Sequence, residues 1–175
     1  LWDASLEKDS CGVGFIAHLK GKRSHEIIEK TLTMNNHMIH RGASGSDPET
    51  GDGAGIFIQM PDKFLRKEMA KKGVELPPEG DYGAGVVFLS PEPSEREAAM
   101  QLVEHIIKEE GQKFLGWRTV PVKSEILGKT SGRYEPAIKQ VFIKRNPEIT
   151  EPMDFERKLY VIRKRVGTSI RTNEI

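Results

Sequence analysis

The sequence lacks several features that mark large classes of protein. With one cysteine in 175 residues it has no internal disulfide and no metal site built from cysteines alone, and it suits a reducing compartment. No apolar run approaches the roughly 20 residues of a membrane-spanning helix. The opening residues also lack the basic start and apolar centre of a secretion signal. We therefore expect a cytoplasmic protein with no membrane partner.

A strong charge of either sign is missing as well. The formal net charge is +1, with 30% charged and 37% apolar residues. Because no block of basic residues occurs, we expect no nucleic acid partner. The chain is long enough for one globular domain with a hydrophobic core, and its composition is that of an ordinary folded domain.

The spacing of apolar residues predicts alternating strands and helices. Strands are expected at 11–18, 56–60, 83–90, 117–120 and 138–143, and helices at 24–40, 61–73, 94–111 and 152–166. Gly42 is predicted to end the first helix in the left-handed conformation, and Ser94 with Glu97 has the spacing of a capping box. This order is typical of a layered mixed fold in which helices cover the faces of a sheet.

The single cysteine, Cys11, is the first candidate for chemistry. It precedes two glycines, Gly12 and Gly14, which would let a ligand approach the sulfur closely. A thiol in such a place can act as a nucleophile once it is a thiolate. A lone cysteine, however, more often packs as a small buried apolar residue. Composition and spacing leave both interpretations open.

The second candidate is the loop 41–55, which is rich in glycine and aspartate. Loops of this length inside a compact domain are usually functional or disordered. The stretch 51–55 resembles a phosphate cradle weakly, but no Gly-Lys-Ser/Thr follows it, so a tight turn before a strand is the better interpretation. Arg41 could hold a carboxylate in bidentate fashion or form a surface salt bridge.

Histidines are the third group considered. His25, His37 and His40 lie on or near the first predicted helix, and the last two are three residues apart. No Asp or Glu at helical spacing completes a set of ligands, so we expect no metal site.

Three segments taken together resemble one family. They are Cys11-Gly12-Val13-Gly14-Phe15, His40-Arg41-Gly42-Ala43 and the loop from Ser46 to Gly55. They resemble the N-terminal glutaminase domain of glutamate synthase large subunits. That domain is a class II glutamine amidotransferase, in the branch of N-terminal-nucleophile hydrolases. The stretches 114–122 and 155–165 are similar to the same domain, so the likeness extends over about 1–166.

The resemblance implies an α+β fold, a four-layer αββα sandwich of antiparallel sheets that is incomplete in this chain. It implies a propeptide-like leader over 1–10, and the N-terminal part of a type 2 glutamine amidotransferase domain over 11–175. Cys11 would be the nucleophile at the start of the mature chain and would form a glutamyl thioester, releasing ammonia. Its own α-amine would serve as the base, since the pKa of an α-amine is near neutral.

The resemblance also implies the rest of the site and its partners. Arg41 and Gly42 would bind the substrate glutamine, and the pocket loop would include Asp47, Gly51, Asp52 and Gly53, with no metal. No cofactor is expected on this chain, whereas FMN and an iron-sulfur cluster are expected in the full enzyme. Ammonia would pass to the remaining synthase domains or subunits of a glutamate synthase, which act as partners. The electron donor could be a pyridine nucleotide or ferredoxin.

Two departures from the family pattern matter. Cys11 is not the first residue, so we expect cleavage between Ser10 and Cys11 to free the α-amine. The Asn-Gly pair that supplies the family's oxyanion donors is absent, and loss of such a donor costs about 10²–10³ in rate. This fragment alone is therefore expected to be inactive. The alternative is a non-catalytic, unprocessed interaction or regulatory module with the same fold.

Overall fold

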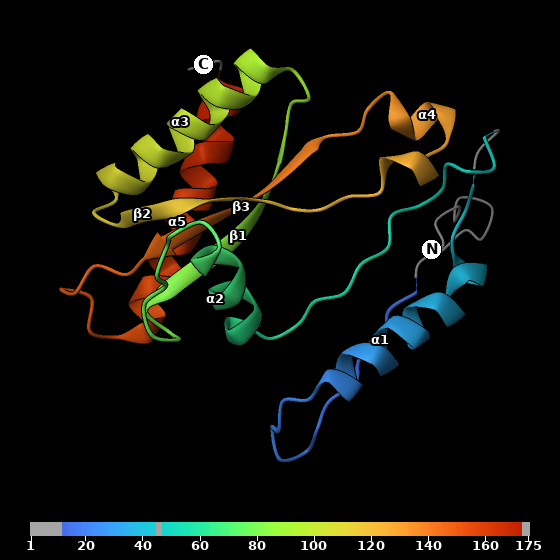
Figure 1. Cartoon of the computed structure of the whole chain (residues 1–175), viewed down its shortest axis with the longest axis horizontal. Helices are drawn as coiled ribbons and strands as arrows, with labels where there is room; N and C mark the ends of the chain where they lie inside the picture. Colours follow the sequence, from blue (N-terminus) through green and yellow to red (C-terminus); the bar gives the residue numbers. More distant parts are fainter. Residues whose placement is uncertain (1–11, 45–46, 173–175) are drawn as a thin grey trace, which may run out of the picture. The chain divides into compact units, whose positions relative to one another are not determined.

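The computed structural model describes residues 12–44 and 47–172 (Figure 1). They form two compact units. The first unit comprises the described residues up to Met60 together with Lys123–Tyr134, and the second comprises Pro61–Val122 together with the described residues from Glu135 onward. Each unit is described separately below.

The second unit is built on a three-stranded antiparallel sheet in the order β1-β3-β2. Its strands are β1 (Tyr82–Leu89), β2 (Lys113–Thr119) and β3 (Ala137–Lys144). The central strand β3 pairs with β1 from Tyr82↔Lys144 to Leu89↔Ala137 without a break. The pairing of β2 with β3 contains a bulge between Phe114 and Gly116.

Two long helices, α3 (Pro93–Glu109) and α5 (Pro152–Arg171), pack on one face of this sheet. Each has a proline in its first turn, where the missing N–H costs no hydrogen bond. Gly111 ends α3 with a φ of 71°. The apolar face of α3 meets the sheet and α5 in a core of buried side chains: Val103, Ile106, Ile107, Val141, Ile143 and Ile162.

The opposite face of the sheet is covered at one end by α2 (Asp62–Ala70). An added Cβ at Gly83 would meet Leu159 of α5, so this residue faces the long helices. The preceding Tyr82 faces the other way, because side chains alternate along a strand. Its hydroxyl donates a 2.9 Å hydrogen bond to Asp62 of α2, and its ring lies 6.5 Å from that of Phe142, centroid to centroid.

Beyond α2 this second face is open. Val86 and Phe88 share the face of Tyr82, since they follow it at even spacing along β1. Their side chains are 54% and 67% exposed. Helices therefore cover one face of the sheet fully and the other face in part.

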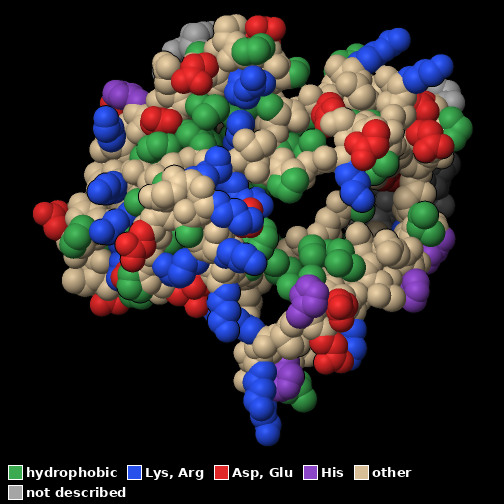
Figure 2. Space-filling view, viewed as in Figure 1, with side chains coloured by type: hydrophobic (Ala, Val, Ile, Leu, Met, Phe, Trp, Pro, Cys, Tyr) green, Lys and Arg blue, Asp and Glu red, His purple; other side chains and the backbone are tan. Residues whose placement is uncertain are grey.

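The first unit contains short elements joined by irregular chain. They are α1 (His25–His37), the 3₁₀ turns η2 (Ile39–Arg41) and η3 (Ser124–Ile126), and α4 (Lys129–Gly132). Among the described residues of this unit no apolar side chain is buried. Figure 2 accordingly shows apolar side chains at its surface.

Most predicted elements are confirmed. The four predicted helices correspond to α1, α2, α3 and α5, and three predicted strands correspond to β1, β2 and β3. The strand prediction is wrong for 12–18 and for 56–60, which pair with no strand among the described residues; residue 11 lies outside them. An apolar run without a partner strand has no ladder of hydrogen bonds to hold it extended.

Two predicted helix ends are also wrong. Gly42 has a φ of −83° and a ψ of 154°, which is extended, because α1 already ends at His37 and the 3₁₀ turn η2 follows. Ser94 lies inside α3, whose N-cap is Glu92, so no capping box forms from Ser94. The α+β class is confirmed, with a small antiparallel sheet, while the four-layer arrangement stays a prediction. The predicted leader and the last three residues lie outside the described range.

Candidate functional site

The segment that follows Cys11 lies against α1 and η2 in the first unit. Cys11 itself lies outside the described residues. A Cβ added at Gly14 would lie 2.5 Å from the Sδ of Met34, and one added at Gly12 would lie 2.9 Å from the Sδ of Met38. Both distances are shorter than real Cβ contacts, so an alanine at either position would force the methionine side chain or the segment to move.

Arg41, the first of the two predicted substrate-binding residues, lies beside the same segment, and Gly42 follows it in the chain. The Cγ of Arg41 would be 3.3 Å from a Cβ added at Gly12, so the stem of the arginine packs against the backbone that follows Cys11. The N–H of Arg41 donates to the carbonyl of Met38 at 2.8 Å, and that of Gly42 to the carbonyl of Ile39 at 3.1 Å. These two hydrogen bonds close the turn η2 and hold the backbone of Arg41 in place after α1.

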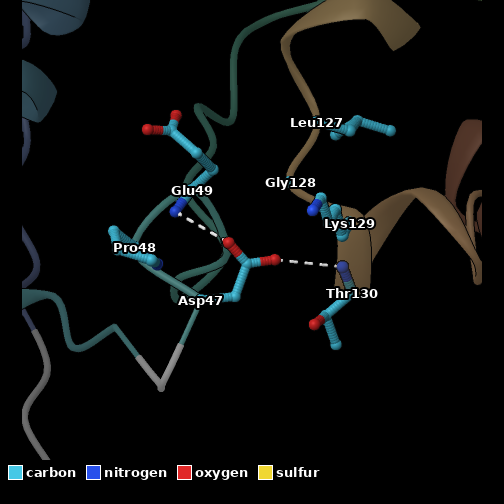
Figure 3. A pocket seen from close by; sticks show the side chains of 7 residues that line it. All are labelled: Asp47, Pro48, Glu49, Leu127, Gly128, Lys129 and Thr130. Atoms are coloured by element: carbon cyan, nitrogen blue, oxygen red, sulfur yellow. Dashed lines mark hydrogen bonds between the residues drawn. The ribbon is translucent and has the colours of Figure 1, made fainter.

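Asp47 occupies the middle of the predicted pocket loop (Figure 3). Its carboxylate accepts hydrogen bonds from the N–H of Thr130 at 3.0 Å, the hydroxyl of Thr50 at 2.9 Å and the N–H of Glu49 at 3.2 Å. These donors, the N–H of Thr130 first, hold the pKa of Asp47 below its usual value, because they favour the charged form.

The same loop caps α4, a helix more than seventy residues away in the sequence. The N-cap of α4 is Gly128, which has no side chain to accept from the first N–H groups of the helix. Asp47 accepts from Thr130 instead, and the hydroxyl oxygen of Thr50 accepts from the N–H of Ser131 at 3.3 Å. A Cβ on Gly128 would lie 2.7 Å from oxygens of both Asp47 and Thr50, so a larger residue would displace the loop.

Gly51, Asp52 and Gly53 form the second half of the loop. The N–H of Ala43 donates to the carboxylate of Asp52 at 2.8 Å, and the N–H of Asp52 donates to the carbonyl of Ala43 at 3.0 Å. Gly51 forms an isolated bridge with Ser44, and a Cβ there would lie 3.1 Å from the carbonyl oxygen of Ala43. Nothing lies within 4 Å of a Cβ at Gly53. Asp47 and Asp52 thus fix the shape of the loop.

An open pocket lies between the two segments that these contacts join. It is lined by residues 47–49 and 127–130 (Figure 3). The N–H groups of Thr130 and Ser131 at the start of α4 are already bonded to Asp47 and Thr50, so they do not face a phosphate. In the described part of the chain, no three His, Cys, Asp or Glu residues lie together as metal ligands would.

The structure brings some predicted site residues together. Arg41 lies near Gly12, and Asp47, Gly51 and Asp52 share one hydrogen-bonded loop. Sequence reasoning missed Met34, Met38 and the whole of α4. The four-residue spacing of the methionines on one helix face was a readable signal, whereas the capping of α4 by a distant loop leaves no local pattern.

None of the described helices is long and apolar enough to cross a membrane.

Comparison with known proteins gives consistent matches over nearly the whole chain. The family pattern "Glutamine amidotransferases class-II" matches residues 11–175. The chain is 46% identical over 164 residues to "Glutamate synthase [NADPH] large chain" of Bacillus subtilis (strain 168), covering 94% of this chain and 11% of the relative. It is 42% identical over 169 residues to "Glutamate synthase [NADH]" of Schizosaccharomyces pombe, covering 94% and 8%.

A third relative is "Ferredoxin-dependent glutamate synthase 2" of Synechocystis sp. (strain ATCC 27184 / PCC 6803 / Kazusa). It is 38% identical over 164 residues, covering 94% of this chain and 10% of the relative. The chain thus spans about a tenth of the length of these curated relatives.

Proposed function

This chain belongs to the class II glutamine amidotransferases, and from that premise we propose that it supplies the glutaminase part of a glutamate synthase. The observation that carries the proposal is the start of the family match at Cys11, the single cysteine of the chain. A match that begins at the proposed nucleophile favours the enzyme over a non-catalytic module with the same fold.

The proposed reaction is hydrolysis of the side-chain amide of glutamine. The thiolate of Cys11 attacks the amide carbon, the C–N bond breaks, and the nitrogen takes a proton and leaves as ammonia. Water then attacks the resulting thioester, releasing glutamate and the free thiol. The α-amine of Cys11 serves as base, so the bond between Ser10 and Cys11 must be cleaved first, because an amide nitrogen has no basic lone pair.

Arg41 and Gly42 are proposed to bind glutamine. The packing of the Arg41 stem against Gly12 supports this role, because the turn that carries Arg41 lies beside the segment that follows the nucleophile. A guanidinium can hold the α-carboxylate of glutamine in bidentate fashion. The pocket is proposed to be shaped by Asp47, Gly51, Asp52 and Gly53. In support, the carboxylates of Asp47 and Asp52 accept hydrogen bonds from backbone N–H groups.

We also propose that the complete domain is a four-layer αββα sandwich. The support lies in the second unit, where α3 and α5 cover one face of the sheet and α2 covers an end of the other. The apolar side chains of Val86 and Phe88 remain exposed on that second face. A second sheet stacked on this face would bury them, since sheets pack through apolar faces about 10 Å apart.

The remaining proposals concern the whole protein. The relatives are far longer than this chain and are named glutamate synthases. We propose that ammonia passes from this domain to the synthase domains or subunits, which make up most of such a protein. FMN and an iron-sulfur cluster would bind there rather than on residues 11–175, and the protein would be cytoplasmic.

Labelling with 6-diazo-5-oxo-norleucine, a reactive analogue of glutamine, tests the proposed function. The longest natural polypeptide that carries this sequence is treated with the reagent, and the labelled peptide and the N-terminus are read by mass spectrometry. We expect one label on a Cys11 that has become the first residue, with labelling and ammonia release lost in Cys11→Ala.

Two outcomes would contradict the proposal. One is full ammonia release by the Cys11→Ala variant, and the other is a label on another residue with Cys11 unmodified. His105→Gln, a substitution on an exposed part of α3, serves as a control that should leave labelling unchanged.

A further inference from the structure

Gly12 and Gly14 each lie over the sulfur of a different methionine, one in α1 and one at its C-cap. Gly14 faces Met34, and Gly12 faces Met38. Met34 and Met38 lie one helical turn apart on the same face, so four residues of helix separate them by about 6.0 Å. The glycines are two residues apart and the methionines four, and the close approach of an added Cβ pairs each glycine with its own methionine.

The residues that alternate with these glycines point away from α1. Val13 is 88% exposed and Phe15 is 90% exposed, whereas Met34 and Met38 are partly buried. The segment thus turns its glycine side, which has no Cβ atoms, toward the helix. The methionine side chains are long and polarizable, and they fill the space against the bare backbone.

We propose that Met34 and Met38 are positioning residues for the nucleophile Cys11. Together with Gly12 and Gly14 they form a contact, the methionine seat, that holds the described segment that follows Cys11 against α1 and its C-cap. A shift of this segment is expected to change how well Cys11 attacks the glutamine amide. The proposal rests on the proposed function, since it concerns the same cysteine. Small errors of position matter at such a centre, because a displacement of about 1 Å can cost about 10² in rate.

Gly14→Ala tests the methionine seat directly. The added methyl group would lie 2.5 Å from the Sδ of Met34, so either the methionine or the segment has to move. Met34→Ala removes that sulfur and makes room for the methyl group. If the two residues touch, the effect of Gly14→Ala is smaller in the Met34→Ala background than in the natural one.

Matched controls are available in the same chain. Gly14→Ala combined with Met38→Ala leaves the Met34 sulfur in place, so no relief is expected. Gly167→Ala in α5 adds a methyl group that meets the end of the Arg171 side chain at 3.8 Å, an ordinary contact. Met34→Leu keeps the bulk of the side chain and is expected to retain most of the activity.

The measurement compares two reagents for Cys11 in the longest natural polypeptide. The glutamine analogue 6-diazo-5-oxo-norleucine depends on aligned attack, whereas iodoacetamide reports access to the thiolate. Rates are taken from chains that begin at Cys11, which the same mass spectra identify. We expect Gly14→Ala to slow labelling by the analogue about tenfold, with iodoacetamide labelling changed less than twofold. Adding Met34→Ala should restore most of the loss.

Three results would overturn the proposal. In the first, Gly14→Ala slows labelling of Cys11 by the two reagents equally, as a purely structural contact would. In the second, the losses in labelling rate caused by Gly14→Ala and Met34→Ala simply add in the double variant. The Gly14→Ala rate equals that of the natural protein while the natural protein is labelled, which rejects the methionine seat and leaves the glutaminase intact. Absence of labelling in the natural protein rejects both proposals together.

Discussion

The second unit buries its apolar side chains, and the first unit leaves its own at the surface. In the second unit α3, α5 and the central strand β3 close around one core, and Phe142 and Ile107 are fully buried. In the described part of the first unit, Val13 and Phe57 are among the side chains in contact with solvent. The first unit keeps its shape through backbone turns and the capping of α4 by Asp47 and Thr50.

This difference separates stability from the proposed chemistry. Stability comes mainly from buried apolar area, so it is concentrated in the second unit. The proposed substrate-binding residues, the pocket loop and the described segment that follows Cys11 all belong to the first unit. Functional segments are commonly drawn from the less stable parts of a fold, because few contacts let them open locally. Substitutions should therefore change the free energy of unfolding strongly in the second unit and weakly in the first.

Removing one aromatic ring from each unit gives the largest expected contrast. Phe142→Ala leaves a cavity beside Tyr82 and should lower the free energy of unfolding by about 3–5 kcal/mol. Phe57→Ala removes a ring that is 102% exposed and should change it by less than about 0.5 kcal/mol. Urea unfolding of the 175-residue chain, followed by circular dichroism, measures both. Equal losses in the two variants would break the comparison.

The sequence predicts the second unit well because local pattern and burial agree there. The apolar face of 94–111 becomes the buried face of α3, and the run 138–143 becomes β3. The run 56–60 has a similar apolar character, yet it pairs with no strand among the described residues. An apolar run forms a strand only when a neighbouring strand supplies hydrogen-bond partners. The spacing of apolar residues does not show whether such a neighbour exists.

For the site, the sequence identified residue types and not their partners. Arg41 lies near Gly12, and Asp52 is bonded to the backbone of Ala43, while the roles of these residues at the site stay predictions. The bond from Thr130 to Asp47 joins residues 83 apart, and no rule of local spacing predicts it. Met34 and Met38 lie within the predicted helix 24–40, but the glycine backbone that approaches them could not be inferred from composition.

Tyr82→Phe probes a polar bond inside the second unit, with a smaller effect. The substitution removes the hydrogen bond to Asp62 and should cost about 1 kcal/mol near neutral pH. Burial, and then the bond to Asp62, raise the pKa of Tyr82 well above its usual value near 10. Above about pH 10 the unfolded chain therefore loses this proton more readily than the folded chain, and stability falls as pH rises.

The variant lacks that ionisation, so its disadvantage should shrink between pH 8 and pH 11. Urea unfolding at both pH values measures the change. Tyr134→Phe, whose side chain is 79% exposed, is the control and should stay within about 0.5 kcal/mol of the natural chain at pH 8. A constant difference between Tyr82→Phe and the natural chain at all pH values would show that the hydroxyl does not ionise on unfolding.

The smallest effect is expected in the first unit, on acidification. The N–H of Thr130 and the hydroxyl of Thr50 hold the pKa of Asp47 below its usual value of 3.8, so its charge favours the folded contact above that pH. That contribution is lost as pH falls from about 4 through the lower pKa of the folded state. The start of α4 should then open while the second unit remains folded.

Hydrogen exchange at the amides of Thr130 and Ser131 measures this opening locally. A local measurement is needed because Glu68, Glu109 and Glu110 of the second unit also have lowered pKa values and contribute to global acid unfolding. Asp47→Asn should expose both amides at neutral pH and remove the acid dependence. Thr50→Val should lower the protection free energy of the Ser131 amide by about 1 kcal/mol. The acid dependence of exchange at Thr130 should remain. Protection that persists in Asp47→Asn would mean that α4 is held by packing, and the two units would then differ less than their burial indicates.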